Sequence, residues 1–166
     1  MDTFFEDYLL RLDDLHEDFK IAIGGLSVDV LDWVPEIASK DSPMNSLCVL
    51  VVHVCGAARY WCGDVALGEI SNRDRNAEFE AKGYTEQDLI AKLDDNIAYF
   101  RTGFAKLSVH DLARSCPAPG RTIRPNSTQL REYNLGWSLL HALEHTGLHL
   151  GHAEITRQLW DSEGQV

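Results

Sequence analysis

Residues 137–159 read WSLLHALEHTGLHLGHAEITRQL, a stretch that holds four of the seven histidines of the chain. The four are separated by four, four and three residues: His141, His145, His149 and His152. An α-helix turns about 100° per residue, so all four imidazoles fall on one face about 80° wide. The length and spacing of the stretch predict a long helix that begins between residues 132 and 135 and ends near residue 160.

The aligned histidines have two interpretations. Imidazole is the commonest transition-metal ligand in proteins, and two histidines one helical turn apart can bind the same ion. The alternative is a polar helix face on which the histidines align by coincidence, and a single His-x-x-x-His pair would favour it. Four histidines in one stripe, beside apolar residues, favour a metal site.

Three more helices are predicted upstream of this stretch. The first spans about residues 3–23, with apolar residues at three-four spacing. The second follows the Ser42-Pro43 opening and ends near residue 67. The third begins after Thr85, with Asp88 completing a variant of the capping box, and ends near residue 108. Four long helices with inward seams predict an all-α four-helix bundle with long connections, a single domain over residues 1–166.

Two connections between the helices are long. Residues 68–84 are polar and are expected to form a surface loop. Residues 109–133 contain three prolines and a glycine and are expected to form a long irregular loop. We expect that second loop to cover or edge the mouth of a site, with a plain surface connection as the alternative.

Polar groups in two of the seams predict one shared site. The seam of the second helix contains His53, and the seam assigned to the fourth runs through Trp137, His141, Glu144, Leu148, His152, Ile155 and Leu159. Burying such groups costs several kcal/mol unless they are paired or bind a metal. We therefore expect His53, His145 and His149 to bind a divalent transition metal, with a fourth position open to water or substrate.

Other residues have supporting roles in this hypothesis. His141 and His152 lie one turn on either side of the ligand pair and are candidates for the proton carrier. Glu144 lies beside them and is a candidate for orienting an imidazole. The mouth of the site is assigned to Tyr60, Trp61, Asp64 and Trp137, with ordinary packing or a solvated position as the favoured alternative for each.

The chain resembles the DinB-like superfamily, also called the YfiT-like putative metal-dependent hydrolases. The resemblance rests on LVVHV around His53 and on HTGLHLGH, which contains His145 and His149. The segment HLGHAEITR, with Glu154 and Arg157, is similar to the subgroup of mycothiol-dependent maleylpyruvate isomerase. That subgroup can have glutamate where this chain has His145, which places the chain between subgroups.

The resemblance implies a bound divalent metal, with zinc and nickel as the first choices, and it allows a low-molecular-weight thiol as a second cofactor. It implies a homodimer and an enzyme that acts on a small organic substrate as a hydrolase or as a thiol-dependent transferase or isomerase. The alternative is a non-catalytic, stress-related bundle whose metal is structural, and such a bundle would unfold on chelation. A di-iron bundle is disfavoured because neither E-x-x-H nor H-x-x-x-E/D occurs in the sequence. A bis-histidine haem site is a further alternative.

Composition limits the partners. The formal net charge is −11, and no basic cluster in the sequence relieves it, which argues against nucleic acid and anionic membranes. No run of 18 apolar residues predicts a membrane span, and the acidic N-terminus does not resemble a secretory signal. Three of the four cysteines repeat every seven residues and are expected to be buried, while Cys116 lies in a Pro/Gly-rich loop and is a candidate for exposure. Neighbours in that repeat would lie about 10 Å apart along a helix, too far for a disulfide, which favours a reducing compartment, the cytoplasm. The absence of C-x-x-C argues against a zinc knuckle or a redox motif.

Overall fold

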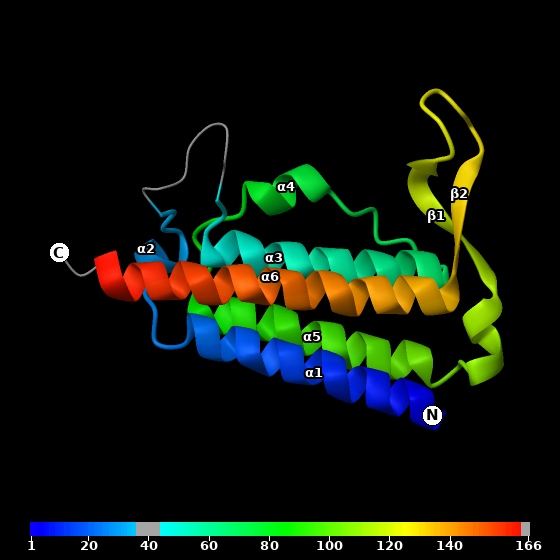
Figure 1. Ribbon diagram of the computed structural model, residues 1–166, viewed down its shortest axis with the longest axis horizontal. Coiled ribbons are helices and arrows are strands. Elements are labelled where there is room, and N and C mark those ends of the chain that lie inside the picture. Colours follow the sequence, from blue (N-terminus) through cyan, green and yellow to red (C-terminus); the bar gives the residue numbers. More distant parts are fainter. Residues whose placement is uncertain (36–43, 164–166) are drawn as a thin grey trace.

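The computed structural model describes residues 1–35 and 44–163, and this part of the chain is mostly helical (Figure 1). The helical content confirms the prediction of a mainly helical protein. The elements in chain order are α1 (Thr3–Ile23), α2 (Val28–Leu31), α3 (Leu47–Ala58), η1 (Arg59–Leu67), α4 (Arg75–Phe79), α5 (Glu86–Phe104), η2 (Val109–Ala113), β1 (Ser115–Thr122), β2 (Leu130–Asn134) and α6 (Leu135–Glu163).

The long helices lie side by side along the longest axis of the molecule (Figure 1). Helix α6 packs against α1 and α3, and α5 packs against the same two helices. The two helices that carry the predicted metal ligands, α3 and α6, are therefore direct neighbours.

Local sequence signals explain where most helices begin. Asp2 caps α1, whose bounds agree with the prediction, and Thr85 and Asp88 form the predicted capping box of α5. Helix α3 begins later than predicted, at Leu47, because the Oγ atom of Ser46 accepts a hydrogen bond from the Val49 amide and caps the helix there. The Ser42-Pro43 opening lies outside the described residues.

Helix α3 continues without a break into η1, which has the wider π-helical winding and ends at Gly68 with φ 75°. Insertions of π-helix are frequent at functional sites because they shift the side chains that follow. By length and composition Leu47–Leu67 is apolar enough to cross a membrane, but 83% of its most apolar window is buried inside the fold. Its hydropathy is that of a core helix.

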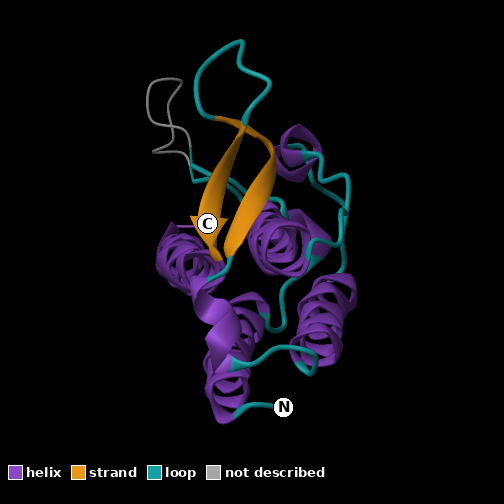
Figure 2. Ribbon diagram, turned by 90° about the vertical axis from the view of Figure 1, so that its right-hand side faces the viewer, coloured by secondary structure: helices purple, strands orange, loops and turns teal. Residues whose placement is uncertain are grey.

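The segment predicted as a long irregular loop is largely ordered, so that expectation was wrong. It forms the short 3₁₀-helix η2 and an antiparallel hairpin of β1 and β2, in which Cys116 pairs with Tyr133. The hairpin rises from one end of the long helices (Figures 1 and 2). Cys116 belongs to an apolar core cluster and is 1% exposed, so the possibility of an exposed thiol is excluded. The other three cysteines are buried as expected, and all four are free.

The connection predicted as a polar surface loop contains α4, which lies over α3 (Figure 1). Asp74 caps this helix by accepting hydrogen bonds from the amides of Asn76 and Ala77. One turn later Glu78 is 7% exposed and points toward α3. A charged residue is rarely buried unless it has partners, so α4 is part of the site and the loop interpretation was incomplete.

The seam predicted for α6 was wrong. Leu148 is 60% exposed and Ile155 is 50% exposed, whereas the buried face combines small, polar and large apolar residues. The buried residues of this face include Leu139, Ala142, Thr146, Leu150, Ala153 and Thr156. Apolar residues occur on more than one side of this helix, so periodicity could not identify the inner side.

Candidate metal centre

Three histidines from two helices meet in one place. One ligand nitrogen each of His53, His145 and His149 lies within 4.8 Å of the other two. His53 comes from the middle of α3, and the other two come from consecutive turns of α6, so the packing of these helices brings them together. The ring centroids of His145 and His149 are 4.5 Å apart, and each lies 5.0 Å from that of His53.

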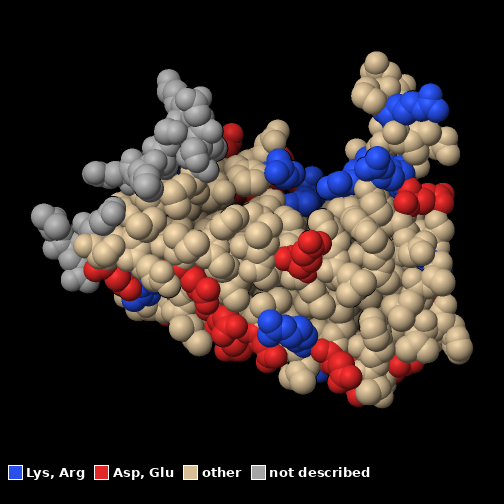
Figure 3. Space-filling model, in the orientation of Figure 1, with Lys and Arg blue, Asp and Glu red and all other residues tan. Residues whose placement is uncertain are grey.

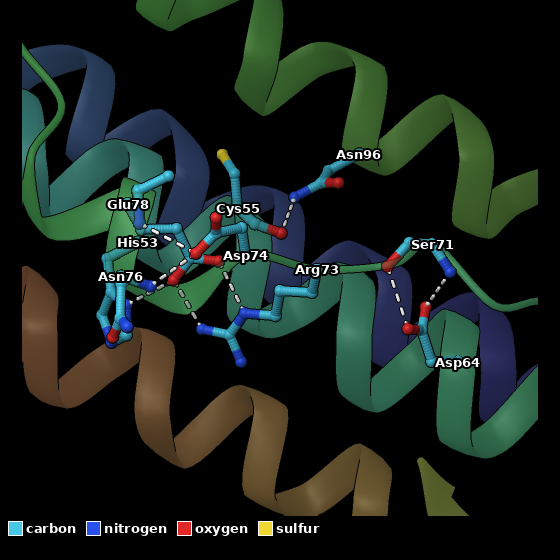
Figure 4. Close-up of polar contacts among 10 residues, drawn as sticks. His53, Cys55, Asp64, Ser71, Arg73, Asp74, Asn76, Glu78 and Asn96 are labelled. Carbon is cyan, nitrogen blue, oxygen red and sulfur yellow. Dashed lines mark hydrogen bonds and ion pairs between the residues drawn. The ribbon is translucent and has the colours of Figure 1, made fainter. Parts of the chain in front are cut away.

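A buried carboxylate orients His53 (Figure 4). The Nδ1 atom of His53 donates a hydrogen bond of 2.8 Å to Oε2 of Glu78. Because a carboxylate only accepts, this bond places the imidazole proton on Nδ1 and leaves the Nε2 lone pair free. A carboxylate behind a histidine is the usual support of a histidine that binds a metal.

Arg73 completes this arrangement. Its Nε atom donates to Oε1 of Glu78 at 2.6 Å, and its Nη2 atom donates to Oε2 at 2.7 Å. Burial raises the pKa of Glu78, but the hydrogen bonds from Arg73 and His53 outweigh burial and leave it below the ordinary value. Glu78 is therefore a carboxylate at neutral pH, held by partners on two sides.

The local electrostatics favour neutral imidazoles. Burial, followed by repulsion from His149 and His53, lowers the pKa of His145 to about 3. Burial, followed by His53, lowers the pKa of His149 to about 4. Only a neutral imidazole has a lone pair for a metal, so these side chains are ready to bind one without losing a proton at pH 7.

One buried atom of the cluster also lacks a partner. Nδ1 of His145 makes no hydrogen bond within the described part of the chain. Buried polar atoms nearly always have a partner, and a bound ion is one reason for an exception. The all-nitrogen donor set, the neutral imidazoles and this atom fit a divalent transition metal such as zinc or nickel.

The predicted catalytic residues lie around the cluster at different positions. Nδ1 of His152 is 3.3 Å from Nδ1 of His149, and the side chain is exposed. The ring of His141 is 5.9 Å from that of His145 and stacks on Trp137, with Trp61 at its edge. The carboxylate of Glu144 is 81% exposed and lies 3.6 Å from Nδ1 of His141, which is not one of the three clustered histidines.

Two recesses lie beside the centre. One has a volume of about 270 Å³ and is lined by His149, His152, Leu50 and Ile155. The other has a volume of about 350 Å³ and lies between η1, α4 and the hairpin, with Tyr60 in its wall. The smaller recess therefore borders the histidines, and the larger one borders Arg73, the partner of Glu78.

The residues predicted to line the mouth of the site lie in different environments. Tyr60 and Asp64 line the larger recess, whereas Trp61 is only 2% exposed and packs edge-on against Trp137. The carboxylate of Asp64 accepts hydrogen bonds from Arg59 and from the amide and hydroxyl of Ser71, so it holds the loop after η1 in place.

The sequence analysis missed Glu78 and Arg73. Both lie in a polar connection, and neither has a spacing that links it to a histidine 20 or more residues away. The segment did contain one signal, the helix cap Asp74, which would have predicted α4. The partner of Glu78 was not predictable from it.

Comparisons with known proteins identify the family of the chain and its fold. Residues 13–162 match the family model described as Mycothiol-S-transferase. The fold is similar to that in "Crystal structure of the conserved protein of locus from Enterococcus faecalis", with a TM-score of 0.64, 16% sequence identity, and coverage of 95% of this chain and 97% of that one. A comparison with curated proteins found no match.

Proposed function

Since the chain belongs to the mycothiol-S-transferase family, within the DinB/YfiT-like superfamily, we propose that it joins a low-molecular-weight thiol, through its sulfur atom, to a small electrophilic organic substrate. Mycothiol is the thiol that the family description names. The observation that carries the proposal is the convergence of His53, His145 and His149 with Glu78 behind His53. The match gives no support to the expected hydrolase activity, and we do not retain it.

In this proposal the three histidines hold a divalent metal, zinc or nickel. Such an ion would bind the thiol as its thiolate and so supply a nucleophile at neutral pH. Glu78 keeps the Nε2 lone pair of His53 turned away from the carboxylate, and Arg73 holds Glu78 in that position.

The transfer requires a proton acceptor and a place for the substrate. The thiol loses its proton, its sulfur forms a bond to an electrophilic carbon, and the leaving group departs with the electrons of the broken bond. His152 lines the smaller recess and contacts His149, so we assign the proton to it. His141 is the second candidate, and Glu144 is positioned to orient its ring.

The first experiment replaces two ligands. His53→Ala and His149→Ala should each lose most of the bound metal in elemental analysis, and both should stop the consumption of mycothiol in the presence of chlorodinitrobenzene. His110→Ala is the matched control because His110 is exposed in η2, outside the centre. Full metal content in both ligand variants would refute the ligand assignment. Full metal content without any thiol consumption in the unaltered protein would refute the transferase.

Two further proposals concern the molecule as a whole. The contacts of α6 and α5 with both α1 and α3 support a four-helix bundle of the DinB-like type. The exposed apolar side chains Leu140, Leu148 and Ile155 on α6 support a homodimer, which light scattering of the purified protein would test. Four free cysteines and a thiol cosubstrate suit the reducing cytoplasm.

A further inference from the structure

Three arginines converge on the larger recess beside the metal centre. Arg73, Arg75 and Arg121 line it, although the chain as a whole has only 15 basic residues against 26 acidic ones. Figure 3 shows basic side chains gathered between α4 and the base of the hairpin, while acidic side chains dominate the opposite edge of that face. A local positive site in a chain with net charge −11 requires a specific explanation.

The charges in the recess do not cancel. Arg73 is paired with Glu78, and Asp64 is paired with Arg59. Within residues 1–35 and 44–163, no carboxylate lies within ion-pair distance of Arg75 or Arg121. Two positive charges are therefore left without a counter-charge at the recess.

The guanidinium groups of Arg75 and Arg121 lie over aromatic rings, and Arg121 also interacts with the hydroxyl of Tyr60, which occupies only part of its N–H groups. Arg121 lies 4.7 Å from the centroid of Trp61, and Arg75 lies 4.6 Å from that of Phe79. A guanidinium over a ring face is attracted through its own face, whereas its hydrogen bonds run in its plane. Arg73 uses Nε and Nη2 for Glu78, and its Nη1 makes no hydrogen bond to any described residue.

We propose that this recess binds the oxyanion of a small organic substrate, a carboxylate or a phosphate ester, through Arg75 and Arg121. The planar fork of arginine matches both groups, and about 350 Å³ is the size of a small-molecule site. Arg73 connects the recess to the histidines because the same guanidinium holds Glu78, which holds His53. The identification of the bound anion as the electrophilic substrate rests on the proposed function. Anion binding itself is measurable without turnover.

The test is an NMR titration of the arginine Nε–H signals in the metal-loaded protein, which detects binding in the millimolar range. Succinate and glycerol 3-phosphate are the two anionic probes, and glycerol is the neutral one. Both Arg121→Gln and Arg75→Gln should weaken the binding of the preferred anion by about tenfold, the effect of losing one charge-assisted hydrogen bond. Both residues are exposed, so the fold should be unaffected.

Arg124→Gln is the matched control because it removes the same charge from the exposed tip of the same hairpin. It should bind as the unaltered protein does. The preferred probe identifies the anion as carboxylate or phosphate, and both results support the site. Three results would overturn the proposal. The first is equal weakening of anion binding in all three variants, and the second is that neither anion binds. The third is anion binding that disappears on metal removal while the Arg75 and Arg121 variants bind normally. If the unaltered protein binds the anion but transfers no thiol, the result counts against the proposed function and leaves the anion site standing.

Discussion

At the scale of single residues, Glu78 shows how one side chain turns a histidine into a directed ligand. Its carboxylate accepts a hydrogen bond from Nδ1–H of His53 and two from Arg73, so the His53 ring has only one orientation that satisfies its partners. Deletion of such a supporting group typically weakens metal binding by about 10- to 100-fold. The position of His53 was predictable from the sequence, whereas its orientation depends on this partner.

His16 provides a prediction about pH at the same scale. It is fully buried on α1, where Nδ1 contacts the carbonyl of Leu93 and Nε2 has no partner in the described chain. Burial lowers its pKa to about 4, and it outweighs the hydrogen bond to the Leu93 carbonyl, which raises the pKa. Lys20 adds a smaller lowering effect, and Asp94 and Glu17 add smaller raising ones. In the unfolded chain the His16 imidazole therefore becomes protonated near pH 6.5, whereas in the folded chain it becomes protonated only near pH 4.

The free energy of unfolding should fall as the pH drops from 6.5 toward 4. Between pH 7.5 and pH 5 His16 alone accounts for a loss of about 2 kcal/mol. Urea unfolding at both pH values should show that His16→Leu lacks this part of the loss, while His110→Leu, at an exposed histidine, retains it. An identical pH dependence in the unaltered protein and His16→Leu would show that His16 is not the cause.

At the scale of elements, the close approach of α4 to α3 depends on Gly56. A Cβ atom at this position would lie 2.0 Å from Oε1 of Glu78, and that carboxylate is held by Arg73 and His53. Gly56→Ala should therefore displace Glu78 and weaken metal binding by about tenfold or more. The effect should appear although alanine favours a helix by about 1 kcal/mol over glycine.

Gly151→Ala is the comparison in α6. Nothing lies within 4 Å of its added methyl group, so the metal-free protein should gain about 1 kcal/mol in stability from the helix propensity of alanine. Metal affinity is measured by competition with a chelator, and stability by urea unfolding. If Gly56→Ala binds metal as tightly as Gly151→Ala, the packing of α4 on α3 does not control the ligand.

At the scale of the whole molecule, the fold has a core that does not need the metal. Two apolar clusters together take buried residues from α1, α3, α5 and α6, and they include large side chains such as Phe5, Phe19, Phe100 and Trp61. The metal ligands come from helices that are already packed together.

Chelation should therefore leave the helical circular dichroism signal in place and lower the unfolding midpoint only modestly. A ligand that binds the folded state alone stabilises it by a few kcal/mol at concentrations 100-fold or more above its Kd. His53→Ala is the control, because chelator should change its midpoint little. Loss of the helical signal on chelation would favour a structural metal in a non-catalytic bundle.

The sequence by itself determined the features that depend on local spacing. Backbone hydrogen bonds in a helix join residues four apart, so α1, the capping box at Thr85 and the long α6 were predictable from short-range patterns. The same spacing predicted that His145 and His149 would lie together on α6, and the seam position of His53 predicted that it faces inward.

Only the tertiary structure decided the features that depend on distant segments. Glu78 meets His53 because α4 folds over α3, and Arg121 of the hairpin lines the same recess as Arg73 of the segment before α4. The inner face of α6 was also decided in this way, because packing against α1 and α3 buries Ala142 and Leu150 and leaves Leu148 exposed. These contacts form between segments separated by many residues, where no local periodicity specifies the partner.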